Sequence, residues 1–345
     1  MTHNTRAVDL VRSLVRGRRR ARVLADVLEL GIPDAVGDGP VPLADLASAL
    51  GVRPADLRRI IRAARAVGLF REEPPGSIRN SPASSLLRAG APGGLRDEAR
   101  HVLSTWTRIA WDNLEHTVRT GESGFVHATG HQVFDFLRDH PLDAAAFHAF
   151  QSEVTRRALP TLLAAACLPT SGTVVDVGGG EGALLAAMLV AAPDLQGTLF
   201  DLPEVIARAR RAPRPDFGSR LRLVAGDFFH EVPDGADAYV LSHVLHDWSD
   251  ERAARILDRV ATASSPASRV LVIENVRPPF ESSLLVSYLD LQMLAAWGGR
   301  ERTRDEYRGL LQRAGLVLTD VRPVDVRTGL TVLTAALQMT SRPDV

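Results

Sequence analysis

The stretch VVDVGGGEGALL, residues 174–185, decides the fold class of this chain. Its β-branched start is followed by a run rich in glycine and then by apolar residues. Glycine lets a backbone turn sharply and lets a ligand approach the free N–H groups at the start of the next helix. The stretch therefore predicts a strand, a ligand-binding loop and a helix, in that order.

Outward from this loop, short β-branched runs alternate with helical segments. We predict strands at TVVDV, GTLFD, RLVAG, AYVLS and RVLVIE, with helices at LLAAMLVAA, VIARARR and ERAARILDRVATA. This alternation is typical of a parallel sheet covered by helices on both faces, in which ligands bind at the carboxyl ends of the strands. We therefore expect a Rossmann-like α/β domain over residues 167–345, with the active site in the loops that follow the strands.

The N-terminal hundred residues are predicted to be mostly helical. Apolar residues between Val8 and Leu28 keep a helical period, and GIPDAVGDGP, residues 31–40, interrupts it. LADLASALGV and PADLRRIIRAARAVGLF then predict two short helices, with Pro54 suited to a first helical position. LFRE and SIRN flank the turn signal PPG. Residues 1–95 thus predict a winged-helix unit, and residues 96–166 predict a further helical segment.

Arginines on or beside the second of these helices leave two functions open for the N-terminal unit: Arg53, Arg58, Arg59, Arg62 and Arg65. A basic helix in such a unit is typical of DNA binding, whereas a solvated arginine face is the ordinary alternative. The chain has 41 basic residues, all arginine, and 41 acidic residues. Because no net charge draws it toward nucleic acid or an anionic membrane, we favour the solvated face.

The composition is that of an ordinary globular protein: 345 residues, 45% hydrophobic and 24% charged, a length typical of about two domains. Cys167 is the only cysteine, so no internal disulfide can form, and its apolar neighbours predict a buried packing residue. The sequence shows neither the apolar core of a signal peptide nor an uncharged apolar run of about 18 residues. We expect a cytoplasmic location and no membrane span.

The glycine-rich loop does not identify its ligand by itself. Gly178, Gly180 and Ala183 satisfy the G-x-G-x-x-A pattern of dinucleotide sites. Asp201 ends the next predicted strand, where a carboxylate can accept hydrogen bonds from ribose hydroxyls. NAD and S-adenosylmethionine share that ribose, so the loop is compatible with an NAD-dependent oxidoreductase as well as with a methyltransferase.

Two further strand ends carry candidate site residues. Asp227 and Phe228 follow the third strand, where they could hold an adenine or where Asp227 could simply cap a turn. His246 follows the fourth strand in LSHVLHDWSD, residues 241–250, with Ser249 or Asp250 placed to cap the next helix. At this edge of the sheet a histidine is either a general base or a packed residue.

The order of these motifs resembles one enzyme family. DVGGGEG, FDLP, GDFF, LHDWSD, VLVIE and GGRERT are similar to the motifs of the metal-independent, S-adenosylmethionine-dependent O-methyltransferases of the caffeic-acid type. The resemblance covers nearly the whole chain. It implies that residues 1–95 are the dimerisation domain of a homodimer and that residues 96–166 contribute to the substrate pocket. It also implies S-adenosylmethionine as donor and S-adenosylhomocysteine as product.

The resemblance implies site residues at positions that match the family motifs. His246 would be the general base, flanked by the carboxylates of Glu274 in VIEN and Glu301 in GGRERT. The donor would be bound by Asp176, Gly178, Gly180, Asp201, Leu202, Asp227, Phe228 and Ser242. The acceptor would be bound by Asp247, Asp290, Met293 and Trp297. The lysine-free composition is similar to that of bacterial antibiotic-tailoring members, which methylate phenols of aromatic natural products.

Two positions depart from the family pattern. Ser242 stands where plant members place a lysine four residues before the base, so one contact to the donor is weaker or replaced. Gln151 stands four residues after Phe147, where many members carry a methionine that grips the acceptor. The second departure bears on the shape and polarity of the acceptor site.

The chemistry explains why a histidine and a carboxylate belong together. A phenol has a pKa near 10 and histidine near 6.5, so proton transfer between them is uphill by about 3.5 units, or about 4.8 kcal/mol. A carboxylate that stabilises the imidazolium and fixes its tautomer narrows this gap. Glu301 would have that role, unless it forms a salt bridge with a neighbouring arginine: Arg300, Arg302 or Arg304.

Other activities remain to be weighed against methyl transfer. A metal-dependent methyltransferase needs clustered Asp and Asn ligands beside the acceptor, and the sequence shows no convincing set, so no metal is expected. Some relatives of the same fold hydroxylate or decarboxylate their substrates instead. A third reading is a winged-helix DNA-binding regulator whose second domain senses a ligand.

Overall fold

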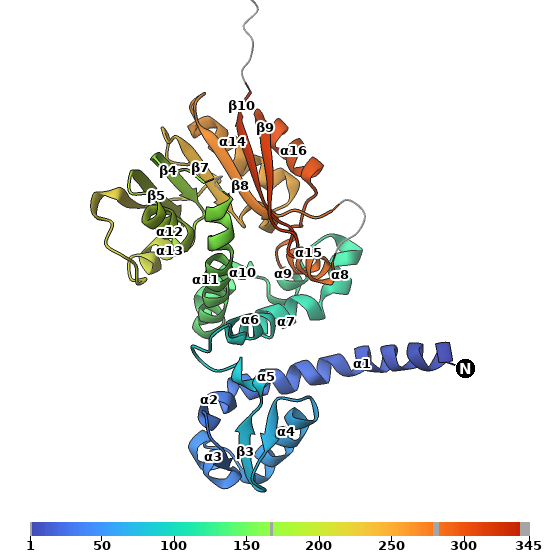
Figure 1. Cartoon of the computed structure of the whole chain (residues 1–345). Helices are drawn as coiled ribbons and strands as arrows, with labels where there is room; N and C mark the ends of the chain where they lie inside the picture. The colour runs from blue at the N-terminus through green and yellow to red at the C-terminus, as the bar shows by residue number, and fades with distance from the viewer. Residues whose placement is uncertain (1, 166–167, 279–282, 339–345) are drawn as a thin grey trace, which may run out of the picture. The chain divides into compact units, whose positions relative to one another are not determined.

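The computed structural model describes residues 2–165, 168–278 and 283–338. The chain divides into two compact units, one made of residues 1–108 and 137–150 and the other of residues 109–136 and 151–345 (Figure 1). The segment 96–166 is therefore shared between the units, and three of its helices run from one into the other: α7 (Thr105–Asp112), α10 (Val133–Asp139) and α11 (Pro141–Ala164). Cys167 lies outside the described residues.

The N-terminal unit contains the two helices and two strands predicted for a winged helix. Its elements are α1 (Thr2–Glu29), α2 (Ile32–Val36), β1 (Val41–Pro42), α3 (Leu43–Leu50), α4 (Pro54–Ala66), β2 (Phe70–Glu72), β3 (Ser77–Asn80), α5 (Pro82–Ser85) and α6 (Arg96–Val102). The three strands pair antiparallel in the order β1-β3-β2. Residues 31–40 interrupt the helical pattern, as predicted, because α1 ends at Glu29; the short helix α2 forms within them, with Pro33 in its first turn, where the missing N–H costs nothing.

Helical spacing places the core of this unit. Leu57, Ile61 and Ala64 lie on one face of α4 and are buried, and Ile32 and Leu46 pack in the same cluster. Pro54 occupies the first turn of α4, as predicted.

The C-terminal unit is built on a seven-stranded sheet within the described residues. Its strands are β4 (Gly172–Val177), β5 (Leu195–Asp201), β6 (Leu221–Ala225), β7 (Ala238–Ser242), β8 (Arg269–Asn275), β9 (Leu316–Asp325) and β10 (Leu330–Leu337). Its helices are α8 (Leu114–Thr120), α9 (Gly124–Thr129), α12 (Ala183–Ala191), α13 (Pro203–Ala209), α14 (Asp250–Ala263), α15 (Leu284–Trp297) and α16 (Arg304–Arg313), with 3-10 turns η1 (Gly218–Arg220) and η2 (Leu245–Asp247).

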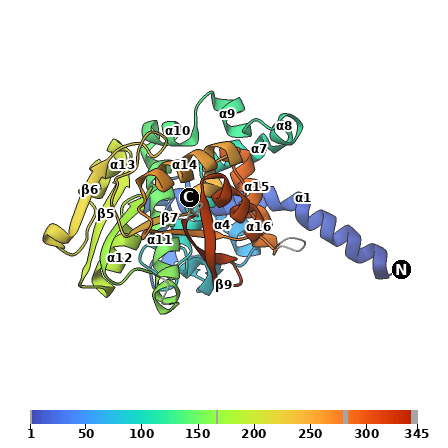
Figure 2. The same cartoon turned by 90° about the horizontal axis from the view of Figure 1, so that it is seen from above.

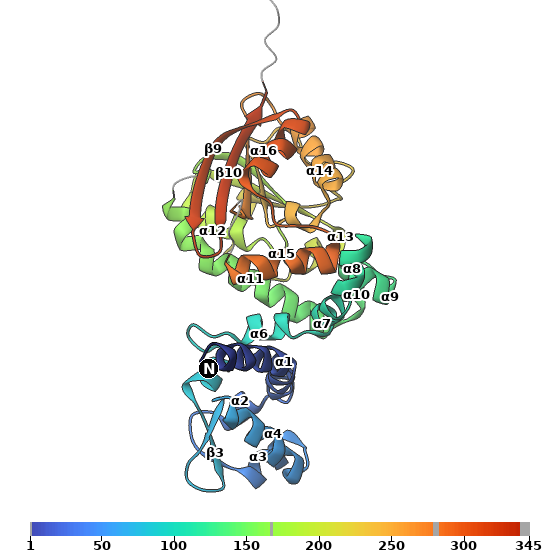
Figure 3. The ribbon, with the colours of Figure 1, turned by 90° about the vertical axis from the view of Figure 1, so that its right-hand side faces the viewer.

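The five strands predicted from the sequence are confirmed and pair parallel to one another, and two further strands that the sequence analysis did not predict, β9 and β10, extend the sheet. The strand order is β6-β5-β4-β7-β8-β10-β9, and β10 runs antiparallel to both β8 and β9. Figure 2 shows β5 and β6 at one edge, and Figure 3 shows β9 beside β10. A tight connection joins β9 to β10, with Gly329 at φ 76°, so no crossover helix separates them and the alternating pattern ends.

Alternate side chains of the central strands face opposite helical layers. Val175 and Tyr239 belong to the core beneath α14 and α16, whereas Val174 and Val240 belong to the core beneath α12 and α13. Because both faces are covered, ligands must reach the sheet at its ends.

Helix α15 packs against α8 and α9 in the same unit. Across the described residues, no helix is long and apolar enough to cross a membrane.

Candidate active site

The glycine-rich loop follows β4 directly and has a conformation that only glycine adopts readily. Gly178, Gly180 and Gly182 have φ angles of 71°, 61° and 83°, in the left-handed region. At Gly179 the reason is space, because a Cβ would lie 2.4 Å from Oδ2 of Asp176. The loop therefore keeps a bare backbone surface at the start of α12, as the sequence predicted.

Two acids lie against this loop: Asp176 is buried and Asp201 is partly buried. Neither carboxylate oxygen of Asp176 has a hydrogen-bond partner among the described residues, and burial, reinforced by the charge of Asp201, raises the pKa of Asp176 to about 7. Asp201 accepts hydrogen bonds from the N–H groups of Gly180 (2.8 Å) and Leu202 (2.7 Å). Burial outweighs these bonds and raises the pKa of Asp201 to about 6. The loop thus carries two acids that a cationic ligand would compensate.

Asp227 and Phe228 stand at the end of β6. Asp227 accepts a hydrogen bond from the N–H of Phe229 (2.8 Å), and its other oxygen lies 2.9 Å from Nδ1 of His230, so it caps the local turn. Phe228 borders the loop, because a Cβ on Gly178 would lie 3.3 Å from its ring. The turn-cap role of Asp227 is what the contacts show, and the adenine role of both residues stays a prediction.

His246 lies in the turn η2, beyond the end of β7, and is buried. Its Nδ1 is 3.1 Å from Oε1 of Glu301 and 3.5 Å from Oε2 of Glu274. Its Nε2 lies 3.6 Å from Oδ1 of Asp247. Oε1 of Glu274 also accepts hydrogen bonds from the N–H groups of Val244 (3.1 Å) and Leu245 (2.8 Å). The carboxylates at Nδ1 thus orient the ring and leave Nε2 for other chemistry.

The alternative reading of Glu301 as a salt-bridge residue was wrong. Among the described residues it pairs with His246, while the neighbouring arginines bind other acids: Arg300 binds Asp250 and Glu306, Arg302 binds Asp250 and Arg304 binds Asp305. Sequence alone did not distinguish these partners because all of them lie within the same short stretch or on η2 and α14.

The surrounding carboxylates set the basicity of His246. Burial alone would lower the pKa of this imidazole, but Glu274, Glu301 and Asp247 outweigh it and raise the pKa to about 10. Burial raises the pKa of Glu274 to about 7 and that of Asp247 to about 6, against the attraction of the imidazolium. An imidazole of this basicity matches a phenol, whose ordinary pKa is near 10.

Three of the four residues predicted to bind the acceptor lie on α15, whereas Asp247 lies on η2 beside His246. Oδ1 of Asp290 accepts a hydrogen bond from the N–H of Glu301 (2.9 Å), so Asp290 holds the segment that carries the carboxylate. Met293 is buried, and Trp297 is partly buried with its ring centroid 6.1 Å from that of Phe134. Phe147 belongs to the N-terminal unit, where it is buried.

Sequence reasoning missed a residue with a strained backbone beside His246. His243 has φ 54°, a left-handed conformation that is uncommon for a residue with a side chain. Its ring centroid lies 5.7 Å from that of His246, and its Nδ1 lies 3.3 Å from Oγ of Ser242. Burial lowers the pKa of His243 to about 3, so it is neutral. No local pattern in HVLHDW marks this conformation.

Comparisons with known proteins match this geometry. A profile of the O-methyltransferase domain matches residues 111–317, and a profile of the O-methyltransferase dimerisation domain matches residues 13–90. Phenazine O-methyltransferase PhzM of Lysobacter antibioticus is 35% identical over 341 residues, covering 97% of this chain and 99% of that protein.

Two solved structures extend the likeness to three dimensions. The mitomycin 7-O-methyltransferase MmcR superposes with a TM-score of 0.89 at 32% identity, over 97% of this chain and 99% of that one. The O-methyltransferase NcsB1 from neocarzinostatin biosynthesis, in complex with S-adenosylmethionine and 2-hydroxy-5-methyl naphthoic acid, superposes with a TM-score of 0.80 at 31% identity, over 92% and 95%. With its glycine loop, its sheet and its dimerisation domain, the chain belongs to the S-adenosylmethionine-dependent small-molecule O-methyltransferases.

Proposed function

We propose that this enzyme methylates a phenolic hydroxyl of an aromatic natural product, with His246 as the general base. The observation that carries the proposal is the buried imidazole whose Nδ1 is held by Glu301 at 3.1 Å. The names of the relatives support the substrate class, since they refer to a phenazine, a mitomycin and a naphthoic acid. These compounds come from bacterial secondary metabolism, which we propose as the setting of this enzyme as well.

The residues of the glycine loop fit the donor. S-adenosylmethionine is a sulfonium cation, and the loop offers the two acids it needs, one of them with both oxygens unpartnered among the described residues. Asp176 and Asp201 would bind the donor together with the backbone of Gly178, Gly180 and Leu202. Phe228 borders the same loop, and Ser242 ends the adjacent strand β7. We propose that Asp227 reaches the adenine. When bound, the donor supplies an activated methyl group that needs no metal.

The protein then has to align the acceptor and take its proton. An ordinary histidine would face a gap of about 3.5 pKa units to a phenol, or about 4.8 kcal/mol. The carboxylates around His246 raise its pKa to about 10 and so remove most of this gap. Nδ1 stays bound to Glu301, so we propose that Nε2 takes the proton from the acceptor hydroxyl. Asp247, 3.6 Å from Nε2, would hold the same hydroxyl.

We also propose that α15 and the helices packed on it line the acceptor site. Oγ of Ser123, at the start of α9, donates hydrogen bonds to the carbonyls of Ala295 and Ala296 on α15. The contact with α9 would therefore hold α15 in place as one wall of the acceptor site near the base. This wall would carry Asp290, Met293 and Trp297. Gln151, in place of a methionine, would make part of this site more polar.

The proposal is tested with purified protein, S-adenosylmethionine and a panel of phenolic polyketides, phenazines and hydroxynaphthoates. Mass spectrometry should detect products that have gained one methyl group, and His246→Gln should form them far more slowly. A product that is hydroxylated or decarboxylated without gaining a methyl group would refute the proposal. It would favour the alternative activity of the same fold.

We further propose that the enzyme is a homodimer joined through the N-terminal unit. Helix α1 exposes apolar side chains that an isolated unit would leave in water: Val8, Leu10, Val11, Leu14 and Val15. Three of the five arginines on or beside α4 have acidic partners within the unit, which favours a solvated face over DNA binding: Arg53 and Arg59 pair with Asp56, and Arg65 pairs with Glu72.

A further inference from the structure

The turn that carries His246 is short and satisfies few of its own carbonyl groups, since only the carbonyl of Leu245 accepts a hydrogen bond from within it, from the N–H of Trp248 (3.3 Å). The 3-10 turn η2 spans only residues 245–247, and it ends at Trp248 in extended conformation. The carbonyls of Leu245, His246 and Trp248 all accept hydrogen bonds from the segment 300–302. Since buried carbonyls without partners are costly, this segment holds the carbonyl side of the turn, whereas Glu274 holds the N–H groups of Val244 and Leu245 at its start.

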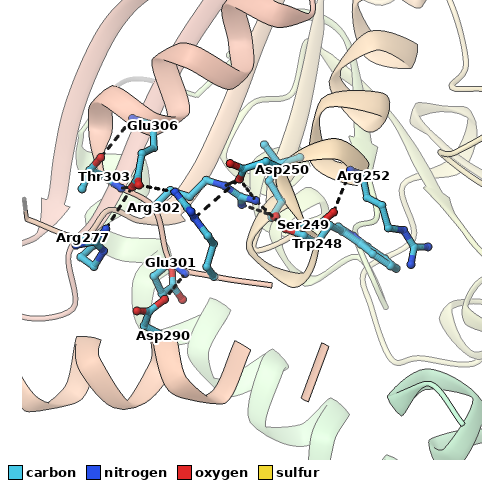
Figure 4. A network of polar contacts seen from close by, with 12 residues as sticks. Trp248, Ser249, Asp250, Arg252, Arg277, Asp290, Glu301, Arg302, Thr303 and Glu306 are labelled. Atoms are coloured by element: carbon cyan, nitrogen blue, oxygen red, sulfur yellow. Dashed lines mark hydrogen bonds and ion pairs between the residues drawn. The ribbon is translucent and has the colours of Figure 1, made fainter. Parts of the chain in front are cut away.

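Arg302 makes most of these contacts. Its Nη1 donates to the carbonyl of Leu245 (2.8 Å), its Nη2 to the carbonyl of Trp248 (2.7 Å) and its Nε to Oδ1 of Asp250 (2.9 Å). Its side chain is fully buried, and Figure 4 shows it directed toward Trp248 and Asp250. Only the planar fork of a guanidinium presents donors in these three directions at once.

The same segment also holds the side chain of the base. Glu301, next to Arg302, binds Nδ1 of His246, and its own N–H is held by Asp290 (Figure 4). Glycine at position 299 allows this segment to pack directly against the turn, because a Cβ there would lie 2.1 Å from the carbonyl oxygen of His246. The backbone and the ring of His246 are thus fixed by neighbouring residues of one segment.

We propose that Arg302 is a positioning residue of the methyl-transfer reaction, which holds the η2 turn so that His246 stays paired with Glu301. This inference rests on the proposed role of His246 as the base. Arg302 acts through the turn and need not touch donor or acceptor. Asp250 neutralises its charge, so that the guanidinium does not oppose the imidazolium.

The test compares Arg302→Met and Arg302→Lys with Arg304→Met, a matched change of an exposed arginine two residues away that pairs with Asp305. We expect Arg302→Met to lower kcat by about 10- to 100-fold, since small misplacements of a reacting group cost this much. The affinity for S-adenosylhomocysteine, measured by calorimetry, should change less than about twofold. Arg302→Lys should lie between wild type and Arg302→Met, and Arg304→Met should match wild type.

The decisive readout is the pKa of His246, measured by NMR with labelled histidine. If Arg302 maintains the pairing with Glu301, the pKa should fall toward 6.5 in Arg302→Met. A loss of kcat with an unchanged pKa would overturn the inference, and so would a kcat equal to that of Arg304→Met. Where Arg302→Met does not fold, Arg302→Lys decides by the same criteria. His246→Gln is measured in parallel. Wild-type activity of that variant would refute the proposed role of His246 as the base. The NMR titration of Arg302→Met would still test whether Arg302 maintains the contact between His246 and Glu301.

Discussion

Replacing Glu301 by glutamine tests the electrostatic account of the base. The substitution keeps the size of the side chain and an oxygen near Nδ1 of His246, but it removes the negative charge at 3.1 Å. The pKa of His246 is raised in the folded protein, so its conjugate acid is the form that Glu301 stabilises. Loss of the charge must therefore lower this pKa, and the base becomes weaker.

The size of the shift follows from the contact. A hydrogen bond to a charged group contributes about 1.5–3 kcal/mol and a neutral one about 0.5–1.5 kcal/mol. The difference of about 1–1.5 kcal/mol corresponds to about one pKa unit. Full charges at this distance would attract by about 5 kcal/mol at an effective dielectric constant of about 20, which sets an upper bound of about four units. Because Glu274 and Asp247 remain, we expect a fall of about one to two units.

The assay is the dependence of kcat/KM on pH, measured from about pH 6 to about pH 10. Wild-type kcat/KM should rise with pH over this range, since only the unprotonated imidazole accepts a proton and its pKa is about 10. In Glu301→Gln the rise of kcat/KM should end at a pH about one to two units lower, and the value of kcat/KM at the plateau should be reduced by up to about 100-fold. Asp305→Asn, a change of an exposed acid in the same stretch, should leave the profile in place. A midpoint that is unchanged or raised in Glu301→Gln would refute the reasoning.

Four further predictions address the base, the donor site, the loop and the assembly. His246→Gln should lower kcat by at least about 100-fold while calorimetry shows unchanged affinity for S-adenosylhomocysteine; wild-type turnover would remove this residue from the mechanism. Asp201→Ala should weaken donor binding by about 10- to 100-fold, and an unaltered affinity would count against its ribose role. Gly179→Ala forces a Cβ against the carboxylate beneath the loop and should cost about 1–3 kcal/mol of stability by denaturant unfolding. Gly180→Ala meets no atom and should show only the left-handed backbone cost of about 1–2 kcal/mol; a larger loss there than at Gly179 would contradict the steric argument. Light scattering should show a dimer, and a monomer would defeat the proposed role of α1.

The features that the sequence predicted well are those with a local cause. Alternating apolar patterns and turn residues placed β4 to β8, and a glycine run placed the loop. The general rule that parallel strands present ligands at their carboxyl ends then brought Asp201 and His246 to the same edge. Motif order added Glu274 and Glu301, whose carboxylates both lie near Nδ1 of His246, and their roles stay a prediction.

The features that the sequence did not predict have causes distant along the chain. In the sequence, Arg302 does not differ from the other arginines of GGRERT. Its buried hydrogen bonds depend on the carbonyls of Leu245 and Trp248, which are distant along the chain. The left-handed backbone at His243 arises where β7 ends beside β8, with its N–H bound to the carbonyl of Ile273. The pKa of His246 likewise depends on three acids converging from separate elements. Such properties appear only once the tertiary structure is formed.

Gly299 limits how this enzyme could be redesigned. Any larger residue would push the 299–303 segment away from the turn that carries His246, and the guanidinium and carboxylate that follow it would move as well. Libraries aimed at new acceptors should therefore leave position 299 invariant and diversify the proposed acceptor wall on α15. Asp290 should be kept as well, because it lies on α15 and accepts a hydrogen bond from the N–H of Glu301.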